Sequence, residues 1–124
     1  MRRLLPVLLL LASLASACVG ERQASAIQGR TLYAENGCVS CHGPAGRGDG
    51  PVGKTLSPPP RDFKNEASYT NGRDEASIAA TLARGIVRNG AKMPAFAHLT
   101  DVERRSLAMY VITLRNTPDE RTAR

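Results

Sequence analysis

The feature that most constrains this chain is a pair of cysteines two residues apart, with a histidine directly after the second. The stretch is Cys38-Val39-Ser40-Cys41-His42. Two thiols at this spacing, followed at once by an imidazole, are the attachment pattern of a c-type haem. The thiols can form thioether bonds to the vinyl groups of the porphyrin, and the histidine can then reach the iron as proximal ligand. The motif therefore predicts one covalently attached haem c, with its iron, and electron transfer as its use.

A Cys-x-x-Cys pair also occurs in redox dithiols and in zinc sites. A thioredoxin-type dithiol belongs to a βαβ pattern, whereas the sequence around these cysteines is helical and rich in glycine. A zinc site needs four ligands, and only His98 and Cys18 remain as further partners. We therefore favour the haem over both alternatives.

The first 17 residues have the organisation of a secretory signal peptide. Arg2 and Arg3 give a positive start, an apolar run covers residues 4–14, and small residues occupy 15–17. The run is too short for a helix that spans a bilayer. We expect an exported protein, in the periplasm or on the outer face of the cytoplasmic membrane, where c-type haem is attached.

Cys18 is the odd cysteine of three and follows this segment directly. Residues 14–18 resemble a bacterial lipoprotein processing site, in which the cysteine becomes the acylated first residue, although Ala15 stands where a large aliphatic residue is preferred. Ordinary signal peptidase would instead cleave after Ala17 and leave a free thiol on Cys18. We favour the lipid anchor on the membrane, with residues 18–25 as a tether to the domain.

The charge of the chain does not indicate nucleic acid as a partner. The full chain has 17 Lys and Arg against 11 Asp and Glu, a net charge of +6. Loss of Arg2 and Arg3 with the signal peptide leaves 15 basic residues and a net charge of +4. Haem propionates would lower that charge further. The remaining basic residues are scattered, as on a solvated surface.

Helical patterns account for the regular structure of one domain over residues 26–115. We expect helices from Ala26 to about Asn36, over 74–84, and from Thr100 onward, where Thr100 and Glu103 form a capping box. No strand pattern or repeat appears, so the predicted class is all-α. Residues 116–124 are expected to be a frayed polar tail.

Residues 43–60 are crowded with glycine and proline, which predicts a long loop. Such length counts against a compact domain unless the loop wraps something. A haem edge is what it would wrap. Leu56 and Phe63 are candidates to touch the porphyrin, although either can be ordinary core, and Asp49 suits a turn.

A domain of about 100 residues has difficulty burying enough apolar surface. This chain has only two phenylalanines, three tyrosines and no tryptophan. A haem would supply a large apolar filler at the centre, which agrees with the attachment motif.

An iron with a histidine on one side needs a second ligand, and Met93 is the favoured one. It lies 51 residues after His42 in an expected loop, where Pro94 would keep it extended. A thioether is a soft ligand that favours ferrous iron. Met109, inside the last helix, and His98, just ahead of its cap, are the competing ligands. A methionine can also simply fill a gap in the core.

In these features the chain resembles class I, monohaem cytochromes c. The resemblance covers about residues 26–115 and implies a small all-α fold, with three main helices and long loops around one covalently attached haem. It also implies that the first and last helices cross. The residues that carry it are the haem motif with Gly43, the Gly50-Pro51 loop, the segment Met93-Pro94-Ala95-Phe96, Gly29 and Tyr33 in the first helix, and Leu107 and Tyr110 in the last.

The resemblance implies a role for each matching residue. Cys38 and Cys41 would form the thioethers, His42 would be the proximal ligand and Met93 the distal one. Pro51 would offer its backbone carbonyl to the other ring nitrogen of His42. Alternatives for that carbonyl are Pro58, Pro59 and Pro60.

With both axial positions filled, the chain is expected to be an electron carrier and not an enzyme, without a small-molecule substrate. Its partners would be redox proteins of a respiratory chain, and a lipid on Cys18 would concentrate it near them. Two alternatives remain. One is an electron-transfer subunit of a larger oxidoreductase complex. The other is a haem enzyme or gas-binding protein in which Met93 dissociates.

Overall fold

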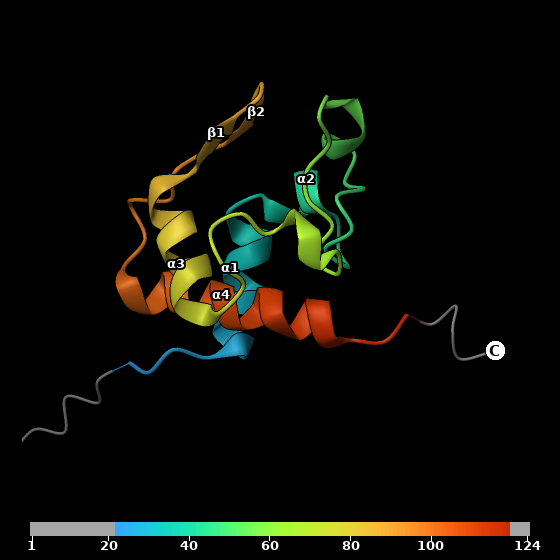
Figure 1. Ribbon diagram of the computed structural model, residues 1–124. Helices are drawn as coiled ribbons and strands as arrows, with labels where there is room; N and C mark the ends of the chain where they lie inside the picture. Colours follow the sequence, from blue (N-terminus) through green and yellow to red (C-terminus); the bar gives the residue numbers. More distant parts are fainter. Residues whose placement is uncertain (1–21, 120–124) are drawn as a thin grey trace, which may run out of the picture.

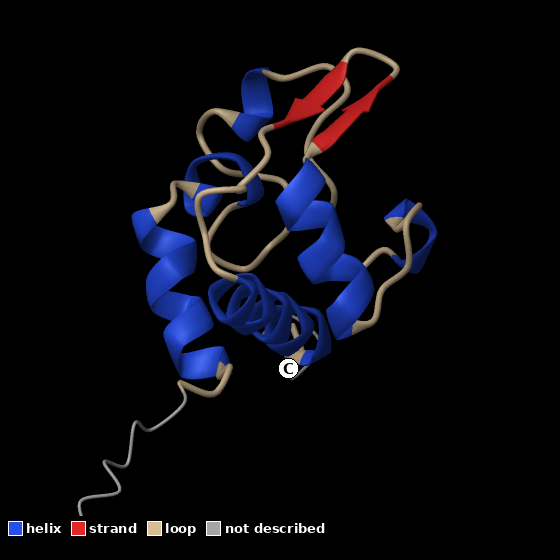
Figure 2. Cartoon of the chain, turned by 90° about the vertical axis from the view of Figure 1, so that its left-hand side faces the viewer, coloured by secondary structure: helices blue, strands red, loops and turns tan. Residues whose placement is uncertain are grey.

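The first and last helices cross and form the base of the fold. The computed structural model describes residues 22–119, in which α1 spans Ala26–Glu35 and α4 spans Asp101–Asn116. A further helix, α3 (Glu75–Arg84), also packs on α4. In Figure 2, α4 is seen nearly end-on, with α1 and α3 on either side of it. The buried apolar core is made of Leu32, Tyr33, Phe63, Ile78, Ala79, Leu82, Leu99, Leu107, Ala108 and Val111.

The backbone of α1 comes closest to α4 at Gly29. A Cβ atom at this position would lie 1.9 Å from the Ser106 carbonyl oxygen and 2.8 Å from the Tyr110 Cβ. One turn later, the Tyr33 ring meets the Tyr110 ring edge-on, with centroids 5.3 Å apart. Leu107 is only 1% exposed. The helix crossing implied by the resemblance is therefore confirmed.

The three long helices begin at polar side-chain caps. Ser25, Asp74 and Thr100 each accept a hydrogen bond from the backbone N–H three residues later. The capping box of Thr100 and Glu103 is complete in both directions. Local sequence thus placed all three helices correctly to within a residue or two at their ends.

Short helical elements interrupt the irregular stretches. The helix α2 (Cys38–His42) begins directly after Gly37, whose φ of 73° reverses the chain after α1. Two 3₁₀ helices, η1 (Gly53–Thr55) and η2 (Glu66–Ser68), follow. Apart from η1, residues 43–60 are irregular, as predicted.

A small β-hairpin was not predicted. β1 (Ile86–Arg88) and β2 (Ala91–Met93) pair antiparallel, with Ile86 opposite Met93. Asn89 and Gly90 connect them with φ angles of 49° and 83°, as a type I′ turn requires. The expectation of no strands was therefore wrong, and Met93 ends a strand instead of lying in a loop. Each strand has three residues, so the all-α class holds.

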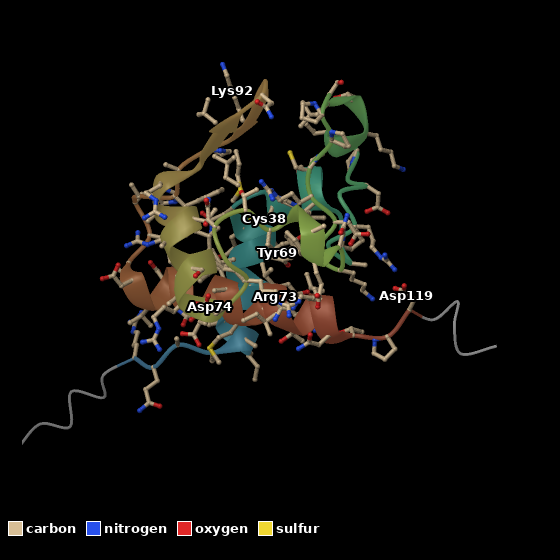
Figure 3. All side chains as sticks on the ribbon, in the orientation of Figure 1. Cys38, Tyr69, Arg73, Asp74, Lys92 and Asp119 are labelled. Carbon is tan, nitrogen blue, oxygen red and sulfur yellow. The ribbon has the colours of Figure 1, made fainter. Side chains whose placement is uncertain are left out.

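Thr117 and Asp119, which follow α4, contact the long loop and the segment directly after it. Lys64 donates to the Thr117 carbonyl and lies 2.7 Å from the Asp119 carboxylate, which also pairs with Arg47. Figure 3 shows Asp119 beyond the end of α4. The expected frayed tail is therefore wrong for residues 116–119. Residues 120–124, and residues 1–21 with the expected signal peptide and Cys18, lie outside the described part.

Among residues 22–119, none of the helices has the length and apolar character needed to cross a membrane.

Candidate haem site

A cavity opens between α2, the proline run and the hairpin. Figure 1 shows the hairpin on one side of the molecule and α2 on the other. The main part of the cavity has a volume of about 690 Å³. A smaller part of about 80 Å³ reaches into the helical core. The size falls within the roughly 300–1,000 Å³ of small-molecule and cofactor sites. The residues that line both parts are Cys38, His42, Arg61, Thr70, Ile86 and Met93.

The helix α2 presents both thiols to the main cavity. Cys38 and Cys41 are three positions apart, hence on one face of the helix, and both line the cavity. Both are free and partly buried, and burial raises the pKa of the Cys38 thiol to about 11. Figure 3 shows Cys38 near the middle of the molecule. Within residues 22–119 no three His, Cys, Asp or Glu side chains gather as a metal site, so a four-ligand zinc site finds no support there.

The glycine-rich loop caps the end of this short helix. Carbonyl groups at a helix C-terminus lack partners within the helix. Here the loop folds back and supplies three N–H groups to them and a fourth to the carbonyl of Gly43, the residue directly after the helix. The bonds run from Val52 to Ser40 (2.9 Å), from Gly50 to Cys41 (3.2 Å), from Gly48 to His42 (2.9 Å) and from Gly46 to Gly43 (3.3 Å). A Cβ at Gly50 would lie 2.3 Å from the Ser40 oxygen, so this approach requires glycine. The long loop thus wraps the attachment motif itself.

The imidazole of His42 lies beside the Arg61 carbonyl, with Nδ1 3.4 Å from the oxygen. Pro51 had been expected to supply this carbonyl. The structure differs, because the neighbours of Pro51 are bonded to the backbone of α2, and Arg61, one residue after the proline run, returns past the ring. Burial lowers the pKa of His42, which favours the neutral imidazole that coordinates metals.

Met93 faces the same cavity from the hairpin. It lines both parts, as His42 does from α2. Leu56 lines the main part and remains 42% exposed. Phe63 lines the smaller part and is buried. The structure thus brings together Met93, Leu56 and the attachment motif.

The two competing ligands lie elsewhere. His98 is exposed, and its Nε2 lies 3.2 Å from the Asn36 side-chain oxygen. Met109 is within α4. Neither His98 nor Met109 is among the described residues that line the two parts of the cavity.

Comparison with known proteins decides the family. Residues 26–115 match the family Cytochrome c. The chain belongs to the cytochrome c family. This membership confirms the all-α fold class, a covalently bound haem c with iron, and a role in electron transfer.

Two relatives are similar to this cytochrome c. The Cbb3-type cytochrome c oxidase subunit CcoP of Azospirillum brasilense is 38% identical over 92 residues, which are 73% of this chain and 29% of that protein. A chain of the reducing HAO-like protein complex Kustc0457/Kustc0458 of Kuenenia stuttgartiensis superposes with a TM-score of 0.62 at 32% identity, covering 72% of this chain and 43% of that one. The cytochrome therefore spans less than half of either relative.

The residues around the cavity suit a haem. An imidazole and a thioether, both established axial partners of haem iron, line one space together with two thiols. The lining also includes Leu56, Ile86, Phe96 and the proline run. Among the described lining residues of the main part, Arg61 and Lys92 are charged and none is a carboxylate. Apolar side chains with two basic residues and no carboxylate are compatible with an apolar macrocycle that carries anionic propionates.

Sequence reasoning missed several residues of the site. Arg61 acts through its backbone carbonyl, which leaves no mark in a sequence. Thr70 and Ile86 line both parts of the cavity. Only Ile86 had a usable signal, since an Asn-Gly turn between two short apolar segments is typical of a hairpin.

Proposed function

We propose that this cytochrome carries one electron at a time on a haem c attached through Cys38 and Cys41, with His42 as proximal and Met93 as distal ligand. The observation that supports the proposal is that His42 and Met93 line the same two cavity parts, one from α2 and the other from β2. The bound haem supplies reversible one-electron cycling of its iron between the ferrous and ferric states.

The chain's own residues adjust that cycling. The thioether of Met93 favours the ferrous state and raises the reduction potential relative to a second histidine. The Arg61 carbonyl lies 3.4 Å from Nδ1 of His42 and would accept a long hydrogen bond from it when Nδ1 carries the proton, which would contribute to the orientation of the ring. Leu56, Phe96 and the proline run limit the access of water to the porphyrin. With His42 and Met93 both bound to the iron, no coordination position would remain for a substrate, so the proposed role is that of a carrier and not an enzyme.

We further propose that the protein works outside the cytoplasm. After removal of residues 1–17, a lipid on Cys18 would hold the domain on the outer face of the membrane through the tether 18–25. Its partners would be redox proteins of a respiratory chain. Both relatives are named as parts of larger assemblies, which supports a role as electron-transfer subunit of an oxidoreductase complex as much as that of a free carrier.

The test compares Met93→Ala with Met109→Ala in the matured, exported protein. We expect the ferric methionine-to-iron band to vanish only in Met93→Ala, and the wild-type ferrous protein to bind carbon monoxide slowly at neutral pH. An unchanged spectrum in Met93→Ala would reassign the ligand. Rapid carbon monoxide binding by the wild type would favour a gas-binding or enzymatic role, and a colourless protein would exclude the haem.

A further inference from the structure

The aromatic ring of Phe63 lies against the face of the His42 imidazole. The ring centroids are 4.7 Å apart, and the two planes differ by 27°. Phe63 is 8% exposed and lines the smaller part of the cavity together with His42 and Met93. One face of the imidazole is therefore covered by an aromatic side chain from the segment after the proline run.

Phe63 is itself held firmly in this position. Its N–H donates to the Gly46 carbonyl at 2.8 Å, and its carbonyl accepts from the Tyr69 hydroxyl at 2.8 Å. A Cβ at Gly46 would lie 2.3 Å from the Phe63 Cδ2, so the ring packs directly on the glycine backbone. On either side of Phe63, Asp62 pairs with Arg47 and Lys64 pairs with Asp119. These contacts fix the position of the Phe63 ring beside the His42 imidazole.

The Arg61 carbonyl alone constrains the imidazole weakly. Its oxygen is 3.4 Å from Nδ1 of His42, beyond the roughly 2.7–3.2 Å of ordinary N–H···O bonds. A histidine bound to iron through Nε2 can still turn about the iron–nitrogen axis. A flat ring stacked on one face opposes that rotation, because turning the imidazole would drive its edge into the neighbouring ring.

We propose that Phe63 is a positioning residue that fixes the plane of the proximal imidazole. The inference rests on the proposed ligation of iron by His42. Groups that orient a metal-bound histidine tune the metal through it. In ferric haem with a histidine and a methionine ligand, the direction of the imidazole plane contributes, together with the orientation of the methionine sulfur, to the distribution of unpaired spin over the porphyrin. Phe63 therefore contributes to the magnetic anisotropy of the oxidised protein without touching the iron.

The experiment uses the full, matured protein and the variants Phe63→Leu and Tyr110→Leu. Leucine keeps an apolar side chain but removes the flat ring. Tyr110 is the matched control, because its ring also contacts another aromatic ring, that of Tyr33, with centroids 5.3 Å apart, and it is not among the described residues that line either part of the cavity. The readouts are the haem-methyl proton shifts and the g-values of the ferric low-spin signal, which a general loss of stability does not move.

We expect Phe63→Leu to change the spread of the methyl shifts and the g-values while the methionine band stays. Tyr110→Leu should leave the g-values closer to those of the wild type. Unchanged methyl shifts and g-values in Phe63→Leu would overturn the proposal.

If the Phe63→Leu variant does not fold with its haem attached, a measurement on the ferrous wild-type protein tests the proposal instead. Nuclear Overhauser contacts between the ring protons of Phe63 and His42 are required, and their absence would overturn the inference. A wild type without a low-spin histidine–methionine spectrum would instead refute the proposed ligation, so the two failures are distinguishable.

Discussion

The Tyr33 hydroxyl donates a buried hydrogen bond of 2.7 Å to the carbonyl of Gly43. Because Gly43 directly follows His42, this bond connects α1 to the C-terminal end of α2. The same carbonyl receives a longer bond of 3.3 Å from the Gly46 N–H. Burial raises the pKa of Tyr33, so its hydroxyl remains a donor at neutral and mildly alkaline pH.

Tyr33→Phe should lower the free energy of unfolding by about 1–2 kcal/mol, because a buried carbonyl loses its better donor. Urea denaturation of the oxidised protein measures this change. Tyr110→Phe is the control. It keeps the edge-on ring contact, and Tyr110 is only half-buried, so we expect a smaller loss. Equal losses in the two variants would show that the hydroxyl of Tyr33 has no special role.

Gly29→Ala should destabilise the fold although alanine is the better helix former by about 1 kcal/mol. The added Cβ would lie 1.9 Å from the Ser106 carbonyl oxygen, and the helices must separate. Overpacking of this kind costs about 1–3 kcal/mol. Near-ultraviolet circular dichroism should also change, since the rings of Tyr33 and Tyr110 meet one turn away.

The variant Gly37→Ala introduces backbone strain without a steric clash, and so serves as the comparison for Gly29→Ala. Nothing lies within 4 Å of a Cβ at Gly37, but its φ is 73°. The expected cost is about 1–2 kcal/mol from the left-handed conformation alone, with an unchanged aromatic spectrum. A stabilised Gly29→Ala protein would contradict the close crossing.

The parts predicted from sequence share a local cause. The capping box at Thr100 and the attachment motif each depend on residues within five positions of one another, so their patterns are visible in the chain. The crossing of Gly29 with the last helix was found through family resemblance, since no local pattern reports a contact 77 residues away.

The parts that were missed depend on distant backbone contacts or on very short elements. α2 has five residues, too few for a helical period, and it is held by N–H groups of a loop that follows it. The strands of three residues are too short to show alternation. The carbonyl beside His42 belongs to Arg61, and any residue type would provide one, so Pro51 was chosen on resemblance and was wrong.

Asp119 should make stability depend on acid pH. Hydrogen bonds from Lys64 and Arg47 lower the pKa of its carboxyl to about 2 from the usual 3.8. Because the folded pKa is the lower one, the stabilisation is complete above about pH 4 and is lost as the pH falls towards about 2. Unfolding free energies of wild type and Asp119→Asn should therefore differ at neutral pH and converge near pH 2, with a smaller difference in high salt.

Asp101→Asn is the control for the Asp119 ion pairs. Asp101 pairs with Arg104 within one helix, and its side chain is 90% exposed. We expect little change in the pH dependence of that variant. If Asp119→Asn and wild type lost stability in parallel between neutral pH and pH 2, the contact between the described end of the chain and the long loop would be energetically neutral.

In the proposed ligation of iron by Met93, the hairpin should control how firmly the Met93 sulfur is held in place. Met93 is paired with Ile86 at the open end of the hairpin, and Gly90 forms the turn with a φ of 83°. Gly90→Ala strains that turn by about 1–2 kcal/mol, and part of this cost is relieved when β2 detaches. Exogenous imidazole should then displace Met93 at up to about tenfold lower concentration, since about 1.4 kcal/mol is a factor of ten. The methionine band reports the titration. Val87→Ala, which alters an exposed side chain of the same hairpin without straining the turn, should titrate like the wild type. Equal imidazole affinity in Gly90→Ala and wild type would mean that Met93 is held by its own packing in the cavity and not by the hairpin.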